Sequence, residues 1–228
     1  MVLTRESLRT GFLQQLVASG GDTIKVLSEA ELRETRQAAL TEHQEGENIW
    51  LFAYGSLIWN PAFHFVSKAQ ARISGYHRRF CLWTHLGRGS KERPGLILGL
   101  DRGGSCRGLA YEIAHNAIES ELDIVWRREM VSAAYRPTWV RMQTEHGPRR
   151  ALTFVINRNH ERYCRQLDDQ KIAAAIAQAQ GPLGTCAEYL FNTTDHLAEL
   201  GIADPSLTRL CTEVRTQLKA PKPVNAEA

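Results

Sequence analysis

The sequence predicts an α+β fold, in which strands come first along the chain and helices last. Apolar and alternating patterns typical of strands fill residues 49–156, and helical periodicity dominates after them. Regular alternation of strands with helices is missing. The chain has 228 residues, enough for one domain with a sizeable core or for one domain plus an extension.

The first 47 residues are polar and rich in helix formers, so we expect a helical extension laid on the core. Within it, Ser28 followed by Glu31 forms a capping box, which predicts a helix start. The apolar run IWLFAY begins at Ile49 and predicts a buried strand that ends in a turn at Gly55. We therefore place the core domain at residues 48–218 and expect the tail, residues 219–228, to be disordered.

Further strands are predicted in the middle of the chain from their apolar content and periodicity. They cover residues 71–83, 96–100, 106–113, 138–144 and 150–156. Residues 101–104, with the sequence DRGG, predict a hairpin turn between the second and third of these strands. Residues 146–148 predict another hairpin between the last two.

Helices are predicted both within and after the strand region. Asn116 with Glu119 suggests the start of a helix that carries basic residues at its other end. Asp169 is the expected cap of a helix that runs to Gln180. The next helix covers about residues 187–200, and the last begins at Asp204 with a proline at its first position.

The charge balance and the cysteines limit the class of protein. The chain carries 28 basic and 25 acidic side chains, and a net charge of +3 does not call for nucleic acid or an acidic membrane as a partner. No apolar stretch approaches the ~20 residues that a membrane-spanning helix needs. The five cysteines are widely spaced, so we expect reduced, packed thiols in a cytoplasmic protein.

Several common catalytic motifs are missing from the sequence. It contains no glycine-rich phosphate loop, no H-E-x-x-H metal motif and no G-x-S-x-G nucleophile motif. The eight histidines are scattered and none accompanies a cysteine cluster. We therefore expect surface or hydrogen-bonded histidines, and a metal assembled from distant ligands is the alternative.

One candidate site is the segment Tyr54-Gly55-Ser56-Leu57, directly after the first buried strand. A sharp turn there leaves backbone N–H groups pointing outward, where they can hold an anion or a carbonyl oxygen, and Ser56 adds a hydroxyl donor. The alternative is an ordinary turn in which the glycine only supplies a positive φ, and spacing alone favours it.

The second candidate is Glu129. Ile118, Leu122, Val125 and Glu129 recur at intervals that place them on one face of a helix, so a carboxylate falls on the apolar stripe. Burial would raise its pKa. The alternatives are that the helix has already ended, or that Glu129 pairs with Arg127 or Arg128 at the rim.

Four segments, taken together and in this order, resemble one family. They are FAYGSLIWNP at residues 52–61, GYHRRF at 75–80, WRREM at 126–130 and GPLGT at 181–185. The chain from about Ile49 to Leu218 resembles the ChaC-like, glutathione-specific γ-glutamylcyclotransferases. One position departs from the pattern, because Ala53 stands where the family usually has glycine.

The resemblance implies a γ-glutamylcyclotransferase-like fold, a small mixed β-barrel with helices around it. It also implies cleavage of glutathione to 5-oxoproline and cysteinylglycine without cofactor or metal. Glu129 would be the catalytic acid and base, and Glu112 is the next candidate if Glu129 is dispensable. The implied substrate-binding residues are Phe52, Ala53, Tyr54, Gly55, Ser56, Leu57 and Tyr189, although an aromatic residue at helical spacing, such as Tyr189, is more often part of a core.

Other functions stay open at this point. Within the same class, the substrate could be another γ-glutamyl amine or a γ-glutamyl amino acid. Basic spots at residues 78–79, 88–93 and 149–150 suggest a nucleic-acid role, but interleaved acids favour solvated arginines instead. A non-catalytic regulatory protein with this fold is a third alternative. The oligomeric state and the role of residues 1–47 do not follow from the sequence.

Overall fold

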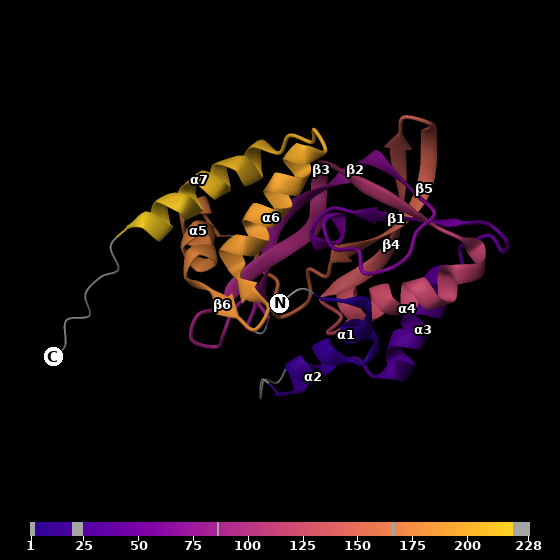
Figure 1. Cartoon of the computed structure of the whole chain (residues 1–228), viewed down its shortest axis with the longest axis horizontal. Coiled ribbons are helices and arrows are strands. Elements are labelled where there is room, and N and C mark those ends of the chain that lie inside the picture. The colour runs from indigo at the N-terminus through magenta and orange to yellow at the C-terminus, as the bar shows by residue number, and fades with distance from the viewer. Residues whose placement is uncertain (1–2, 20–24, 86, 166, 221–228) are drawn as a thin grey trace.

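The core is a closed, five-stranded mixed β-barrel, seen in a computed structural model that describes residues 3–19, 25–85, 87–165 and 167–220. Its strands are β1 (Ile49–Ala53), β2 (Ser67–Thr84), β3 (Gly95–Ile113), β4 (Tyr135–Thr144) and β5 (Gly147–Ile156). They follow the order β1-β3-β2-β4-β5, and parallel pairings of β5 with β1 and β3 close the barrel. Helices lie around it (Figure 1), so the predicted α+β class with a small barrel is confirmed.

The predicted hairpin at residues 101–104 is wrong, whereas the hairpin between β4 and β5 is confirmed. The chain runs through residues 101–104 as part of β3, which pairs with β2 over most of its length. Gly103 and Gly104 have φ values of 100° and 69° and form a bulge opposite Gly75. The glycines therefore bend one long strand where the sequence suggested a reversal of direction.

Asp101 explains why the strand continues, because its side chain is fully buried and fixed by several donors. Its carboxylate lies 2.6 Å from Arg158 Nε and 3.3 Å from Arg79 Nη1, and it accepts a hydrogen bond from the Tyr163 hydroxyl at 2.8 Å. A turn residue is normally solvated, whereas this carboxylate joins β2, β3 and the segment after β5.

On one side of the barrel, α5 (Asp169–Gln178) and α6 (Cys186–Glu199) contact β3, and α7 (Pro205–Lys219) packs on both of these helices. The predicted cap of α7 at Asp204 is confirmed. The cap of α5 is Asp168 and not Asp169. This helix also ends earlier than predicted, because Gln180 belongs to the short strand β6 (Gln180–Gly181), which pairs with β7 (Gly184–Thr185).

Helix α4 (Ile118–Glu129) packs its apolar face into the core. Ile118, Leu122 and Val125 are buried, as their spacing predicts. The predicted cap at Asn116 is wrong, because a 3₁₀ turn at His115–Ala117 precedes the helix and Ala117 occupies the cap position without a side-chain hydrogen bond. Asn116, the residue predicted to cap the helix, is therefore part of the 3₁₀ turn.

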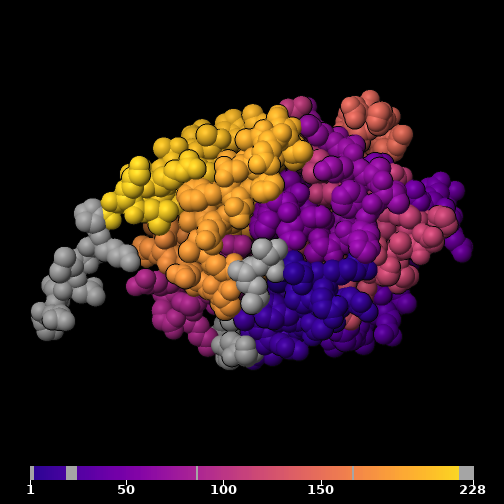
Figure 2. All heavy atoms as spheres, in the orientation of Figure 1, coloured from indigo at the N-terminus to yellow at the C-terminus, as the bar shows by residue number. Residues whose placement is uncertain are grey.

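The N-terminal helices α1 (Arg5–Arg9), α2 (Phe12–Ser19) and α3 (Glu29–Leu40) all contact α4. The capping box of Ser28 and Glu31 is confirmed. Arg5 forms an ion pair with the buried Glu121, and Arg36 lies 2.7 Å from Asp123. In the space-filling view these helices, in indigo, lie directly against the barrel residues in purple (Figure 2).

Two predicted domain boundaries stay predictions. The first boundary separates residues 1–47 from residues 48–218 in the sequence. In the structure, buried side chains and ion pairs join the N-terminal helices to α4. The tail predicted to be disordered, residues 219–228, lies outside the described residues from position 221 onward.

The prediction of packed cysteines outside disulfides is confirmed, since all five are buried and none is disulfide-bonded. Burial raises the pKa of the Cys81 thiol to about 12, so this residue stays an unreactive thiol at neutral pH. Within the described ranges, no helix is both long enough and apolar enough to cross a bilayer.

We predict that Asp101→Asn lowers the free energy of unfolding by about 2–4 kcal/mol, because it removes a buried charge from three partners. Burial tends to raise the pKa of Asp101, but hydrogen bonds from Arg158 and Tyr163 outweigh it and hold the pKa below its usual 3.8. The stabilisation is therefore present above the unfolded-state pKa and is lost as pH falls through the folded-state value.

Chemical denaturation at pH 7 and near pH 3 measures this difference, which should shrink at the lower pH. Asp195→Asn, a matched change at an exposed position of α6, should shift stability by less than about 0.5 kcal/mol. An Asp101 variant as stable as the wild type at pH 7 would contradict the role given to this carboxylate.

Candidate active site

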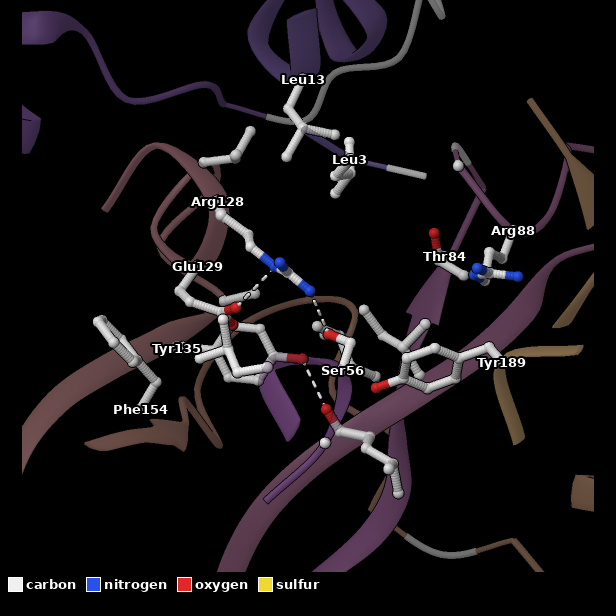
Figure 3. Close-up of a pocket in the computed structure, with 18 of the residues that line it drawn as sticks. Leu3, Leu13, Ser56, Thr84, Arg88, Arg128, Glu129, Tyr135, Phe154 and Tyr189 are labelled. Atoms are coloured by element: carbon white, nitrogen blue, oxygen red, sulfur yellow. Dashed lines mark hydrogen bonds and ion pairs between the residues drawn. The ribbon is translucent and has the colours of Figure 1, made fainter. Parts of the chain in front are cut away.

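A cavity opens beside the barrel, between the end of α4, the loop after β1, α6 and the N-terminal helices. Both candidate features of the sequence, Glu129 and the Gly55-Ser56 turn, line it. Figure 3 shows Glu129 and Arg128 on one side, Ser56 in the middle and Tyr189 with Arg88 on the other. The predicted residues that line the cavity are Phe52, Tyr54, Gly55, Ser56, Leu57, Glu129 and Tyr189.

Glu129 is the last residue of α4, so the helix does not end before it. Its side chain is 14% exposed, and Oε1 lies 3.3 Å from Arg128 Nε. Burial raises the pKa of Glu129, and the charge of Arg128 opposes this only in part. The sequence therefore predicted the burial and the direction of the pKa shift, and the pairing with Arg128 that it left as an alternative is also present.

Arg128 connects Glu129 to the turn after β1. Its side chain is 6% exposed, and Nη2 donates to Ser56 Oγ at 2.8 Å while Nη1 donates to the Asn60 carbonyl. Burial lowers the pKa of the guanidinium, and Glu129 partly compensates. An arginine with such fixed contacts can orient the carboxylate beside it.

The turn after β1 is a short 3₁₀ helix, Ser56–Ile58. The ordinary-turn alternative assumed a positive φ at Gly55. The φ of Gly55 is −137°, so this glycine is not needed for a left-handed conformation. A Cβ at Gly55 would lie 3.2 Å from the Tyr189 hydroxyl. Glycine therefore permits a close approach between the turn and α6, which brings Tyr189 to the cavity.

Two buried side chains that the sequence analysis gave no role hold this turn in place. The Tyr111 hydroxyl donates to the carbonyls of Leu57 and Ile58 at 3.1 and 3.0 Å. Arg78 Nη1 donates to the Tyr54 carbonyl at 2.8 Å, and its Nε lies 2.9 Å from Asp204 at the start of α7. The segment GYHRRF thus supplies a fixed support for the turn.

Three tyrosines face the cavity. The hydroxyl of Tyr54 donates to the Phe154 carbonyl at 2.8 Å, and that of Tyr135 donates to the Leu98 carbonyl at 2.7 Å. Burial is the main cause of a raised pKa in Tyr54, Tyr135 and Tyr189, and the charge of Glu129 adds to it. All three therefore stay protonated near neutral pH.

The N-terminal helices contribute apolar residues to the cavity, which the sequence analysis did not predict. Leu3, Leu13, Leu16 and Val17 line it. The segment is fixed at its edge, since the Asn60 amide donates to the Leu3 carbonyl at 2.9 Å. The only signal in the sequence was the apolar face of this extension, and no local pattern says which surface that face covers.

Two of the arginines that we expected to be solvated are in fact buried or nearly so. Arg78 is enclosed by β2, β3 and α7, and Arg88 lines the cavity. Arg78 donates to the Tyr54 carbonyl and pairs with Asp204, and Arg88 donates to the Thr185 carbonyl. They therefore do not contribute to an exposed basic surface.

Two candidate residues lie away from the cavity lining. Ala53 is a buried strand residue paired with Leu109, so its place in a substrate loop stays a prediction. Glu112 accepts hydrogen bonds from Asn48 and Ser67 near the start of β1. In the part of the chain that the structure describes, no cluster of three or more His, Cys, Asp or Glu side chains could hold a metal ion.

Comparisons with known proteins identify the family of the chain. Residues 49–217 match the family described as ChaC-like protein. The Escherichia coli protein named glutathione-specific gamma-glutamylcyclotransferase is 38% identical over 203 residues, which cover 88% of each chain. Its mouse relative, glutathione-specific gamma-glutamylcyclotransferase 1, is 30% identical over 158 residues, which cover 67% of this chain and 71% of the relative.

A solved structure supports the fold independently. The crystal structure of a yeast gamma-glutamyl cyclotransferase specific to glutathione aligns with a TM-score of 0.68 at 21% identity, covering 74% of this chain and 96% of the yeast chain. At this identity the match establishes the barrel architecture alone. The family match at residues 49–217 spans all five strands of that barrel, and the chain belongs to the ChaC-like protein family.

Proposed function

We propose that this protein is a glutathione-specific γ-glutamylcyclotransferase that releases 5-oxoproline and cysteinylglycine, with Glu129 as the acid and base. One observation carries the proposal: a buried carboxylate with a raised pKa shares a cavity with the Gly55-Ser56 turn, and Arg128 bridges the two. Membership of the ChaC-like family, and the names of the Escherichia coli and mouse relatives, support the choice of substrate.

The reaction is an internal rearrangement of the substrate. The α-amine of the γ-glutamyl residue attacks its own γ-carbonyl carbon, a C–N bond forms to close the five-membered ring, and the C–N bond to cysteine breaks. No enzyme nucleophile is required. The α-ammonium loses one proton before the attack and a second once it has become the ring nitrogen, and the departing nitrogen gains two to leave as an ammonium group. A single group that takes and returns a proton twice therefore suffices.

The burial of Glu129 suits this task. An α-amine titrates near 8 and an ordinary Glu near 4.3, a mismatch of roughly 4–5 kcal/mol for the first proton transfer. Removing water from around the carboxylate raises its pKa and narrows the mismatch. The apolar residues from the N-terminal helices, together with Leu82 and Phe154, keep the cavity poor in water.

Arg128 keeps the carboxylate usable as a base. Without a neighbouring cation, a desolvated Glu would be protonated before substrate arrives and could not accept a proton. The ion pair at 3.3 Å favours the charged form, and the hydrogen bond to Ser56 fixes the direction of the guanidinium. Arg128 is thus a positioning residue between Glu129 and the turn.

The turn after β1 would hold the γ-glutamyl group. In a 3₁₀ turn the first N–H groups precede the first internal hydrogen bond, which here runs from Ile58 to the Gly55 carbonyl at 2.9 Å. The N–H groups of Ser56 and Leu57 are therefore not consumed by the turn. Donors of this kind stabilise an oxyanion that develops on an attacked carbonyl, and losing one typically costs about 10²–10³ in rate.

We predict that Glu129→Gln lowers kcat by about 10²–10⁴-fold while the protein stays folded, because the amide keeps the shape but cannot accept the proton. Release of 5-oxoproline from glutathione measures the effect. Glu119→Gln, on the exposed side of the same helix, should retain full activity. An active Glu129 variant would move the base elsewhere.

The rate should depend on pH through Glu129. Because the base must be ionised and its pKa is raised, kcat/KM should fall on the acid side with an apparent pKa above 4.5. Arg128→Met removes the cation that lowers this pKa and should move the acid limb to higher pH. Arg127→Met, whose partners Asp123 and Glu29 lie outside the cavity, should leave the limb unchanged. Superimposable profiles for the wild type and the Arg128 variant would count against the pairing.

Ser56→Ala should reduce kcat/KM by about 10-fold, less than Glu129→Gln, because the variant loses one charge-assisted hydrogen bond but keeps the backbone donors. Steady-state kinetics with glutathione measure the loss. A Ser56 variant as inactive as the Glu129 variant would instead assign the hydroxyl a direct chemical role.

A further inference from the structure

The charge inside the cavity exceeds what the proposed chemistry uses. Among the described residues that line it, the side chains of Arg88, Arg128 and Arg162 carry positive charge, and Glu129 is the one carboxylate. A positive excess in a largely apolar cavity favours anionic ligands. The substrate of the proposed function has two carboxylates, one on the γ-glutamyl residue and one at the end of the peptide that leaves.

Arg88 lies across the cavity from the catalytic pair. In Figure 3 Arg128 and Glu129 are on one side, Ser56 lies between, and Arg88 lies above Tyr189 on the other side. The guanidinium carbon of Arg88 is 5.5 Å from the centre of the Tyr189 ring. Arg88 therefore lies on the side of the cavity away from Glu129, which the far end of an extended anionic substrate would reach.

The segment GPLGT, residues 181–185, holds Arg88 in position. The proposed reaction mechanism assigns no role to this segment. The Leu183 N–H donates to the Gly87 carbonyl at 2.7 Å, and Arg88 Nη1 donates to the Thr185 carbonyl at 2.8 Å. A Cβ at Gly181 would lie 2.4 Å from Gly87 O, so this glycine permits the close approach of the hairpin to the backbone beside Arg88. Gly184 has a φ of 106°, and a Cβ there would lie 2.5 Å from Glu188 Oε2 and 3.3 Å from Arg88 Nη1.

The charge of Arg88 is only weakly balanced by the protein. The neighbouring carboxylate is that of Glu188, whose Oε2 lies 3.8 Å from Arg88 Nη1. The Glu188 side chain is 61% exposed, and it already accepts a hydrogen bond from the Thr185 N–H in a capping box. The Arg88 side chain is only 13% exposed, and burial lowers its pKa. By contrast, Asp123 and Glu29 outweigh burial and raise the pKa of Arg127.

From this arrangement we propose that Arg88 binds the terminal carboxylate of the leaving peptide, so that the site selects γ-glutamyl peptides with a free C-terminal carboxylate over γ-glutamyl amides and amines. The inference rests on the proposed function and assigns the second half of the cavity. Arg128 is committed to Glu129, Ser56 and Asn60, and Arg88 is left to anchor the far end of the substrate.

The first test needs no variant. Glutathione is compared with γ-glutamylcysteinylglycinamide, which differs only in having an uncharged amide at the glycine end. We expect kcat/KM to be about 10- to 100-fold higher for glutathione, mainly through KM, as a charge-assisted contact to a carboxylate predicts. Equal turnover of the two substrates would overturn the assignment of Arg88 alone, whereas no release of 5-oxoproline from either would overturn the proposed function.

The second test removes the guanidinium. Arg88→Met should lose the preference for glutathione through a rise in KM for glutathione, while turnover of the amide stays near the wild-type value and shows that the variant is folded. Arg88→Lys should restore part of the preference. Arg150→Met is the matched control, because Arg150 also lies over an aromatic ring, at 4.9 Å from Trp139, and beside a glutamate, but outside this cavity.

A preference that survives in Arg88→Met, or one that disappears instead in Arg162→Met, would overturn the proposal. A fall in kcat for both substrates without a change in their ratio would also overturn it, since that result would assign Arg88 a purely structural role.

Discussion

The chemistry of this cavity depends on the balance between the burial of Glu129 and the charge of Arg128 beside it. Burial alone would leave the carboxyl group neutral, and a strong solvent-exposed ion pair would leave it too weak a base to accept a proton from an amine. At 3.3 Å and largely out of water, the pair lies between these limits. The rest of the fold can be understood as the means of keeping this pair dry and aligned with the turn after β1.

Segments far apart in the sequence meet to do so. Helix α4 delivers Glu129 by packing its apolar face on the barrel, β1 delivers the turn, and α6 delivers Tyr189. Arg78 connects the turn to the start of α7, so the C-terminal helices stabilise the same element that Arg128 contacts from the other side. The N-terminal helices complete the cavity with apolar residues and are fixed to α4 through ion pairs.

The features that the sequence predicts correctly are those that depend on residues close together in the chain. Periodicity placed Glu129 on a buried face, and capping residues located α3 and α7, because these signals act within one or two turns of a helix. The turn at residues 101–104 was misjudged because the burial of Asp101 depends on Arg158, more than fifty residues away. Arg88 is predicted to be solvated for the same reason, because the Thr185 carbonyl that it contacts lies far along the chain, in the β6–β7 hairpin. Contacts between segments that are far apart in the chain cannot be predicted from local sequence patterns.

The most direct measurement is a titration of the Glu129 side chain by NMR, with ¹³C-labelled glutamate and the Glu129→Gln spectrum to assign its carboxyl signal. We predict a midpoint above the ordinary value of 4.5, and one that rises further when Arg128 is replaced. A midpoint at or below 4.5 in the folded protein would contradict it, because such a carboxylate would be too weak a base for the α-ammonium group.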